Sequence, residues 1–401
     1  MKLLRNVLFL FLINIFLAGT PLHSQQIRYD RVDFLDNPSW ANVLDRAQQT
    51  GNIIFLDGYT SWCAPCKKME KEVFTRTEIA NYFNQKFINV KYDMEGGEGG
   101  MLKEKYGVQA FPTYLFITPE GQAIHRIIGA HTAGNDFFDW SKMAVTPGRS
   151  YIELEQRYQN GERNPTMMFD YMLVLHMAGE QEKEAAITKD YLSRMTKDHF
   201  MDISYWSAVK RFLNDPTSRE FRILLDNRQE IGEAVGQADV DDKIYETIDQ
   251  QIKASRNFIA YEGHLFNNEA AQALVELLQR TDNIPKRNEL LARAKAGLLI
   301  RNGDLYELAY MVNTLLDFHV LEGYPDLNGE LDFYASSIYK LALDDQLFRM
   351  ALQWSELACA SEKSPARRAV FLKTKAMLLE KLGRSAEAAL AKKEAAAAEK
   401  M

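Results

Sequence analysis

Apolar residues follow two different patterns along this chain. Up to Gly148, short continuous apolar runs alternate with segments in which apolar residues recur at helical spacing. Short continuous runs are typical of strands that are buried on both faces of a sheet. Strands are therefore expected at residues 53–56, 87–92, 113–117 and 123–128.

Helical segments separate these expected strands. The first should begin at Asn37 and Pro38, an N-cap residue followed by proline in the first turn, and should end before Gly51. Strand-helix-strand order, with a hairpin turn at 119–121, predicts an α/β fold in which helices flank a mixed sheet. Further helices are expected at 63–73, at 78–87, up to Tyr106, and at 134–144.

The run at residues 95–100 consists only of glycine and glutamate. A glycine-rich loop that cradles phosphate ends in Gly-Lys followed by Ser or Thr, and that ending is absent from this run. The run is therefore predicted to be a flexible loop.

After Gly148 the pattern is helical throughout, which predicts an all-α domain of helical hairpins. Asn164-Pro165, Asp215-Pro216 and Ser364-Pro365 each combine a capping side chain with a proline for the first turn of a helix. Two apolar stripes mark amphipathic helices, namely Leu305, Leu308, Ala309, Val312, Leu315 and Leu316, and Leu347, Met350, Ala351, Trp354, Leu357 and Ala358.

The end of the chain has a second, partial pattern. From about residue 331 the helices pair at intervals of about 40 residues, and residues 377–388 resemble the turn of a tetratricopeptide-type hairpin. The aromatic and glycine positions of that repeat do not recur upstream at a fixed period, which favours an irregular stack of hairpins. Residues 386–400 are expected to form a final capping helix.

The first 24 residues have the three-part form of a secretory signal. Lys2 and Arg5 precede an apolar run at 7–18, and small and polar residues follow up to Ser24. The run is shorter than the roughly 20 residues that span a bilayer, so a permanent anchor is the weaker alternative. The expected organisation is a signal at 1–24, a first domain at 27–146 and a helical domain at 149–401, in a protein exported to the periplasm or beyond.

Composition and charge narrow the function classes. With 46% hydrophobic and 26% charged residues, the chain is neither wholly disordered nor a multi-span membrane protein. The formal charge is −7, and loss of Lys2 and Arg5 with the signal would leave −9. This mildly acidic balance argues against nucleic acid as a partner.

Thiol chemistry is concentrated at one point of the chain. Of the three cysteines, Cys63 and Cys66 form a C-x-x-C between a strand and a helix. The positive end of that helix would stabilise a Cys63 thiolate, so an exposed Cys63 is the expected nucleophile and Cys66 the resolving thiol. Trp62 and Pro65 would form an apolar rim for a substrate peptide.

Two other readings of the cysteine pair stay open. A zinc site would need four ligands, and Cys359 is far away in a helix, where it is expected to be a small buried hydrophobe. The pair could also be an inert structural disulfide. His125 and His131 have no ligand-spaced partner, so both are expected at the surface, and neither a metal nor a cofactor is predicted.

Residues 35–145 resemble the thioredoxin superfamily, and the Trp-Cys-x-Pro-Cys-Lys signature at 62–67 carries the resemblance. The resemblance implies that Asp57 is the buried acid that exchanges a proton with the resolving cysteine, and that Lys91 accompanies it. It also implies a cis-proline at Pro112, beside which substrate backbone adds as a strand. Gly129 fits the glycine that follows the last strand of the family.

Asp57 can also be read from the residues themselves, whereas Phe111 departs from the family's pattern. A carboxylate at the end of an apolar strand should be desolvated and its pKa raised, although a loop-capping role for Asp57 is the alternative. Phe111 is bulkier than the residue usually found before the family's cis-proline, which would alter substrate choice or cover the sulfurs.

The resemblance implies an exported thiol-disulfide oxidoreductase that acts on cysteine-containing client proteins. Residues 67–74 look most like the periplasmic thiol-reducing branches, so a reducing or isomerising role is expected. An upstream electron donor, with a membrane protein as one candidate, would re-reduce a reducing pair. The alternative is an adaptor whose helical domain binds clients and whose thioredoxin-like domain is secondary. Oligomeric state cannot be read from the sequence.

Overall fold

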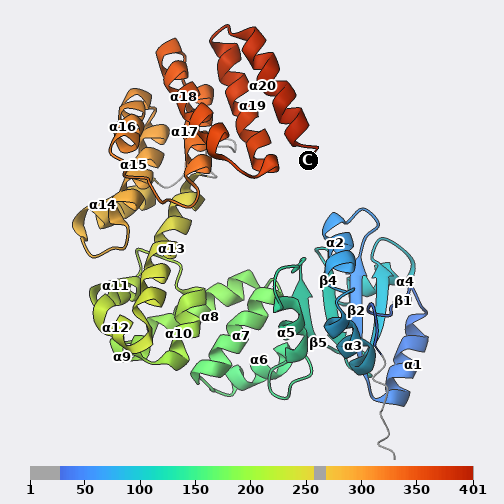
Figure 1. Ribbon diagram of the computed structural model, residues 1–401. Helices are drawn as coiled ribbons and strands as arrows, with labels where there is room; N and C mark the ends of the chain where they lie inside the picture. The colour runs from blue at the N-terminus through green and yellow to red at the C-terminus, as the bar shows by residue number, and fades with distance from the viewer. Residues whose placement is uncertain (1–27, 257–267, 401) are drawn as a thin grey trace, which may run out of the picture. The chain divides into compact units, whose positions relative to one another are not determined.

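The computed structural model describes residues 28–256 and 268–400 (Figure 1). The chain forms two compact units, Met1–Ala185 and Ala186–Met401, which are described separately here. The predicted signal at 1–24 lies outside the described residues. Among the described residues, no helix is both long enough and apolar enough to cross a membrane.

A five-stranded mixed sheet forms the centre of the first unit. The order is β1-β3-β2-β4-β5, in which β1, β3 and β2 are parallel and β4 and β5 are each antiparallel to their neighbour. This confirms the predicted mixed sheet. The strands are β1 Leu35–Asp36, β2 Ile53–Tyr59, β3 Phe87–Asp93, β4 Thr113–Ile117 and β5 Ala123–Ile128.

Helices cover both faces of this sheet. One face is mainly aliphatic, where Val43 and Ala47 of α1 pack with Leu56 and its neighbours, Tyr92 and Tyr106 included. The other face is aromatic, with the rings of Phe55 and Phe83 4.7 Å apart. The helices of this part are α1 Trp40–Thr50, α2 Ala64–Glu72, α3 Thr77–Lys86, α4 Gly97–Lys105 and α5 Asp136–Met143.

The acidic glycine run is helical from Gly97 onward, so the prediction of a flexible loop there was wrong. Gly97 to Gly100 form the first turn of α4, and a Cβ added at Gly99 would lie 1.9 Å from the backbone oxygen of Asp93. Only glycine therefore allows α4 to approach the end of β3 this closely. The run serves the fold, because the Glu98 carboxylate accepts the backbone N–H of Trp40 at the start of α1.

The predicted start of α1 was also wrong. The helix begins at Trp40 after the N-cap residue Ser39, and Asn37 has a φ of 43°. Asn37 instead uses its side-chain oxygen to accept the N–H of Asp93, which joins it to the end of β3. Asn37 therefore makes a long-range contact and does not cap α1. Gly51 ends the helix, as predicted.

Two further helices, α6 Tyr151–Gln159 and α7 Pro165–Met177, pack against β5. His125 of β5 is 2% exposed, and its Nδ1 accepts the backbone N–H of Tyr151 at 3.2 Å. The expectation of a surface histidine was wrong here, because the helix start covers the ring. The division between domains at 146–149 stays a prediction, and the first compact unit extends to Ala185.

Among its described residues, the second unit contains helices and no strand, as predicted. Of the predicted capping residues, Asn164 in the first unit and Ser364 in the second cap their helices, whereas Asp215 binds Thr217 in a turn and Ser218 caps the next helix. The helices are α8 Gln181–Ser193, which contains the division between the units, α9 Lys197–Met201, α10 Ile203–Phe212, α11 Arg219–Asp226, α12 Arg228–Val235, α13 Gln237–Arg256, α14 Asn268–Arg280, α15 Arg287–Asn302, α16 Leu305–Asp317, α17 Leu327–Leu341, α18 Asp345–Ser361, α19 Pro365–Lys381 and α20 Ser385–Ala398.

The predicted apolar stripes lie in α16 and α18 and contribute to one core cluster with α17, α19 and α20. Two members of the stripes lie outside this cluster, since Leu357 is 51% exposed and Leu315 is half-buried. Helices α19 and α20 pack as a hairpin around a turn at Gly383, which has a φ of 71°. The resemblance to tetratricopeptide repeats stays a prediction.

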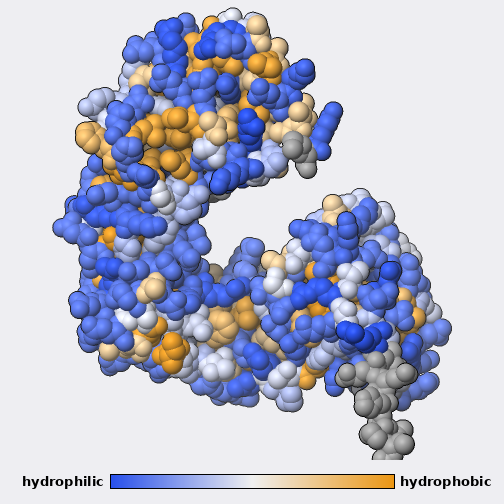
Figure 2. All heavy atoms as spheres, viewed as in Figure 1, coloured by the Kyte–Doolittle hydropathy of each residue, from blue (hydrophilic) through white to orange (hydrophobic). Residues whose placement is uncertain are grey.

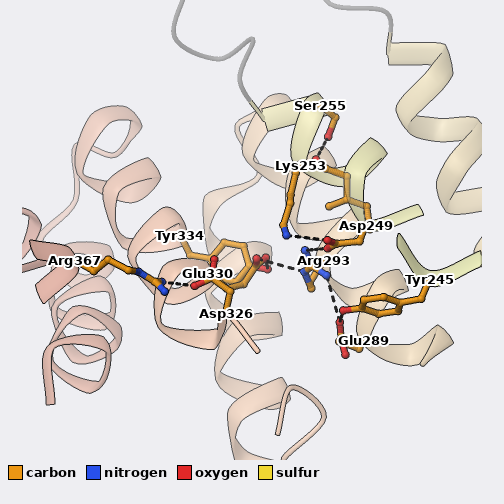
Figure 3. A network of polar contacts seen from close by, with 11 residues as sticks. Tyr245, Asp249, Lys253, Ser255, Glu289, Arg293, Asp326, Glu330, Tyr334 and Arg367 are labelled. Carbon is orange, nitrogen blue, oxygen red and sulfur yellow. Dashed lines mark hydrogen bonds and ion pairs between the residues drawn. The ribbon is translucent and has the colours of Figure 1, made fainter. Parts of the chain in front are cut away.

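A buried arginine joins three helices of the second unit (Figure 3). Arg293 of α15 is fully buried and pairs with Asp249 of α13 at 2.5 Å and with Glu330 of α17 at 3.3 Å. Glu289, one turn earlier on α15, lies 3.3 Å from the same guanidinium. The ring of Tyr324 covers the guanidinium at 4.0 Å. A buried charge of this kind needs several partners, and these carboxylates supply them.

Candidate functional site

The cysteine pair lies where β2 gives way to α2, as the sequence predicted. Cys63 is the N-cap residue of α2, and its Sγ accepts the backbone N–H of Cys66 at 3.1 Å. The two residues form a disulfide with their Cα atoms 5.3 Å apart. The helix start therefore directs its free N–H groups at the Cys63 sulfur, which favours a thiolate there after reduction.

The cysteines are less exposed than expected. Cys63 is 2% exposed and Cys66 is 8% exposed, so the expectation of an exposed Cys63 was wrong for this disulfide form. Each sulfur is covered in part by the other, and the N–H of Cys66 lies against Cys63.

Asp57 is a buried member of β2 between two other strands. It pairs with Lys91 of β3 on one side and with Tyr114 of β4 on the other. Its side chain is buried, and its Oδ1 has no hydrogen-bond partner among the described residues. Burial raises the pKa of Asp57 to about 7, with a further rise from Glu70 and a smaller opposing effect of Lys91. A carboxyl with this pKa can both accept and release a proton near neutral pH.

Lys91 neighbours Asp57 in the sheet, but its ammonium group forms ion pairs with two other carboxylates. Its Nζ lies 3.5 Å from Glu70 and 3.9 Å from Asp36. Glu70 was not predicted as a site residue from the sequence. Its place four residues after Cys66 on the same helix was the available signal, because residues four apart share a face.

The rim residues form a separate group. Trp62 is 65% exposed, and its ring lies edge-on to Phe111 with centroids 6.1 Å apart. The indole Nε1 donates to Glu95 at 2.8 Å, and Lys103 lies over the Phe111 ring at 5.6 Å. Pro65 is exposed in the first turn of α2. An apolar rim is therefore present beside the cysteine turn.

The Phe111–Pro112 peptide bond is cis, as the resemblance implied. Pro112 directly precedes β4, and Thr113 pairs with Gly58 of β2. This register places Pro112 at the end of β2 from which the cysteine turn starts. Its carbonyl accepts the N–H of Gly129 at 2.9 Å, and Gly129 has a φ of 94° that favours glycine.

A cavity of about 90 Å³ connects the inner residues of the site. Its lining includes Cys66, Asp57 and the charged residues Glu70 and Lys91. Cys63 and the rim residues are not among its lining residues. The site thus has an outer rim and an inner cavity on the Cys66 side, whose wall contains Phe34 and Phe74 beside the charged residues.

The remaining candidates lie outside this site. Cys359 is buried, as predicted, and burial raises the pKa of its thiol to about 11. His131 is half-buried, with Nε2 2.9 Å from the backbone oxygen of Ile128 and its ring against Trp140. Within the described ranges, no group of three or more His, Cys, Asp or Glu residues is arranged to hold a metal ion.

Comparison with known proteins places this region in a family. Residues 40–142 match the model of a thioredoxin-like domain. Thioredoxin H4 of Arabidopsis thaliana is 32% identical over 95 residues, which is 24% of this chain and 75% of that protein. The thiol:disulfide interchange protein DsbD of Pseudomonas fluorescens is 27% identical over 128 residues, or 31% of this chain and 22% of that protein.

One solved structure is also similar in sequence to part of this chain. A putative disulphide-isomerase from Bacteroides thetaiotaomicron is 39% identical, and the alignment covers 30% of this chain and 98% of that one with a TM-score of 0.28. Each of these matches covers less than a third of the chain. The chain belongs to the thioredoxin family of protein-disulfide oxidoreductases, with Cys63 and Cys66 as its CxxC pair.

Proposed function

We propose that this chain is an exported thiol-disulfide oxidoreductase that reduces or isomerises disulfides of cysteine-containing client proteins. The observation that carries the proposal is the placement of the Cys63–Cys66 pair at the start of α2, with the cavity behind Cys66 also lined by Asp57. A buried acid with a pKa of about 7 beside a resolving thiol is suited to proton transfer near neutral pH.

The reaction proceeds in two thiol-disulfide exchanges. The Cys63 thiolate of the reduced pair attacks one sulfur of a client disulfide, and the other client sulfur leaves as a thiolate. Cys66 then gives its proton to Asp57 and attacks Cys63. The bond between Cys63 and the client breaks as the Cys63–Cys66 disulfide forms, so the client gains two electrons and the pair loses two.

The outer rim would hold the client during these steps. Trp62, Pro65 and Phe111 present apolar surface beside the cysteine turn, and the cis-proline Pro112 stands at the end of β2. A client strand could pair with the backbone there, since main-chain bonding gives affinity without requiring one sequence. Lys91, the neighbour of Asp57 in the sheet, would lower the pKa of Asp57.

The remaining parts of the proposal concern location and partners. The leader at 1–24 supports export, and an upstream electron donor in the membrane would return the pair to the dithiol form. N-terminal sequencing of the protein isolated from periplasm tests export, because a retained Met1 would contradict cleavage.

Insulin reduction with dithiothreitol as electron source tests the activity. Wild type should accelerate precipitation of the insulin B chain, Cys63→Ser should abolish the acceleration, and Cys359→Ser should leave it unchanged as the matched control. Cys66→Ala should accumulate mixed disulfides with clients, which can be recovered and identified. Full activity of Cys63→Ser would overturn the proposal.

A second candidate function is an adaptor in which the helical unit binds clients. Exposed apolar side chains in that unit favour it, including Leu343 at 98%, Phe318 at 75% and Tyr310 at 74%. On the face drawn in Figure 2, hydrophobic atoms also gather over the region of α15 to α17. If an assay of client function is restored by Cys63→Ser but not by a Leu343→Asp, Phe318→Asp double variant, the adaptor reading is correct.

A further inference from the structure

Helix α16 exposes two aromatic side chains on the face that points away from its core. Leu308 and Val312 of this helix are buried in the core cluster on the opposite face. Tyr306 and Tyr310 are four residues apart, so they are neighbours on the helix, and they are 53% and 74% exposed. Tyrosine is enriched in protein interfaces, where its ring supplies apolar area and its hydroxyl a polar contact.

A residue from the start of α18 extends this aromatic face. The hydroxyl of Tyr306 donates a hydrogen bond to the side chain of Asp344, the N-cap residue of α18. Leu343 directly precedes Asp344 in the chain and is 98% exposed. The bond between Tyr306 and Asp344 therefore holds Leu343 next to the aromatic face, and the exposed apolar side chains belong to two elements.

The charges around these side chains are mostly negative. Residues 302–339 contain no lysine or arginine, although about one residue in eight of the whole chain is basic, with 48 in 401. Glu307 lies three residues before Tyr310, Asp317 lies seven residues after it, and Asp345 is the first residue of α18. All three carboxylates are exposed, and within the described ranges none of them forms an ion pair.

The sign of this charge excludes some occupants of the surface. In a symmetric dimer through this surface, the carboxylates of two copies would face each other, and like charges across an interface are unfavourable. A small cation would pair with the carboxylates but would leave Leu343 and the tyrosine rings uncovered. Arg349 of α18 interacts with Asp344, so a basic group is also present at the edge, but the balance of charge is acidic.

The length of the surface fits a short extended segment. Residues 306 to 317 of α16 cover about 16 Å at 1.5 Å per residue, and about five residues of extended chain have the same length. Successive side chains of an extended chain point to opposite sides. A segment that alternates basic and apolar residues would thus present both kinds of side chain along the helix.

We propose that a surface formed by α16 and the start of α18, here named the α16 surface, binds a basic polypeptide segment of a partner protein in which lysine or arginine is interspersed with apolar residues. Its members are Tyr306, Glu307, Tyr310, Asp317, Leu343 and Asp345. The proposal gives a chemistry to the partner of the second candidate function above, and it does not depend on the thiol-disulfide exchange.

Each part of the α16 surface has a separate role in this binding. The carboxylates attract the basic side chains and pair with them. The tyrosine faces accept the same cations by cation–π contact, which is strongest where water is excluded. Leu343 covers the apolar residues of the segment. Charge and apolar contact must therefore both be present in the partner.

Fluorescence anisotropy of the full chain with labelled peptides tests the proposal. The first probe is a peptide of about eight residues in which arginine alternates with leucine, long enough to cover the helix face. It should bind, and its affinity should fall as sodium chloride is raised, because salt screens exposed charges. A peptide of glutamate and leucine, and a peptide of arginine and glycine, should each bind at least about tenfold more weakly.

One pair of substitutions tests the apolar contact. Tyr310→Ala with Leu343→Ser should weaken binding of the arginine-leucine peptide by about tenfold, and both changes leave the bond between Tyr306 and Asp344 in place. Ile203→Ala with Leu390→Ser is the matched control, because these two side chains are also exposed in the second unit but lie on α10 and α20. The control should bind as wild type does.

A second pair reverses the charge. Glu307→Lys with Asp317→Lys should exchange the preference, so that the glutamate-leucine peptide binds more tightly than the arginine-leucine peptide. Glu233→Lys with Asp242→Lys makes the same change of net charge at exposed positions of α12 and α13, and it should keep the wild-type preference. If the first pair does not fold by thermal unfolding, Glu307→Gln with Asp317→Asn should weaken the arginine-leucine peptide about fivefold.

The outcomes separate this proposal from the functions proposed above. Equal affinity of wild type for the arginine-leucine and glutamate-leucine peptides overturns the α16 surface, and so does an equal loss in a variant and its control. Cys63→Ser should bind the peptide as wild type does. Peptide binding without insulin reduction supports the surface and contradicts only the exchange reaction. Insulin reduction without peptide binding contradicts only the surface.

Discussion

Oε1 of Glu70 lies 3.5 Å from Nζ of Lys91, so the lysine beside Asp57 in the sheet is paired with a glutamate on α2. Asp36 lies 3.9 Å from the same Nζ on the other side. The cation that would stabilise the Asp57 carboxylate is therefore shared with two other carboxylates. Ionisation of Asp57 then depends on burial and on the charge of Glu70.

Glu70→Gln should lower the pKa of Asp57 below its value of about 7. The change removes a negative charge that raises this pKa and frees Lys91 to interact with Asp57, which predicts a fall of about 0.5–1 unit by carbon NMR. Glu72→Gln on the same helix is the control, because Glu72 is exposed beside Lys68. A rise of the pKa in Glu70→Gln would contradict the assigned role.

Asp57→Asn should stabilise the protein at pH 8 but not at pH 3. The pKa of Asp57 is raised from an ordinary value near 4 to about 7, so the folded chain holds a proton that the unfolded chain releases in this window. The contribution of Asp57 to stability is therefore present below about pH 4 and is lost as pH rises to about 7. Guanidinium unfolding should show a gain on the order of 2–4 kcal/mol at pH 8. Asp139→Asn, at an exposed site, should show no such gain.

His125→Leu should remove an acid-sensitive contribution to stability. Burial lowers the pKa of His125 to about 3, and Nδ1 must stay unprotonated to accept the N–H of Tyr151. The unfolded state binds the proton first, so this contribution is present above about pH 6.5 and is lost as pH falls to about 3. The variant should lose about 1–2 kcal/mol of unfolding free energy at pH 7, and its stability should fall less steeply than that of wild type as the pH is lowered. His319→Leu, at an exposed site, should do neither.

Arg293→Met should destabilise the second unit strongly. Removing the guanidinium leaves Asp249, Glu289 and Glu330 without their shared cation, and breaking such a buried pair costs about 3–5 kcal/mol. Arg367→Met is the control, since Arg367 is half-exposed in its pair with Asp326 and should cost less than about 1 kcal/mol (Figure 3). Chemical unfolding of the two variants measures the loss of unfolding free energy. An equal loss in both would contradict this prediction.

Gly99→Ala and Gly100→Ala should have opposite effects. A Cβ at Gly99 would meet the Asp93 carbonyl at 1.9 Å, whereas a Cβ at Gly100 meets nothing within 4 Å. Gly99→Ala should therefore destabilise the first unit by about 2 kcal/mol or more, and Gly100→Ala should stabilise it by about 0.5–1 kcal/mol through helix propensity. Thermal unfolding of the pair tests whether the close approach of α4 to β3 is real.

The sequence predicted strand bounds and helix caps correctly where the interactions that fix them lie between residues close together in the chain. The bounds of β4 and β5 agree with the apolar runs, and Asn164 and Ser364 cap their helices because cap and first turn are neighbours in the chain. The cysteine pair falls at the start of α2 for the same reason. β2 extends past its apolar run to Tyr59, because pairing with β3 and β4 extends the strand through polar Asp57.

The sequence by itself determined the order of elements and the position of the thiol pair, since these depend on residue type and short spacing. Only the tertiary structure decided that Glu70 takes the charge of Lys91, that the glycine run is helical against β3, that His125 is buried, and that Asp57 and Cys66 line one cavity. Each depends on which side chains meet across elements distant in the chain, where packing and desolvation outweigh local preference.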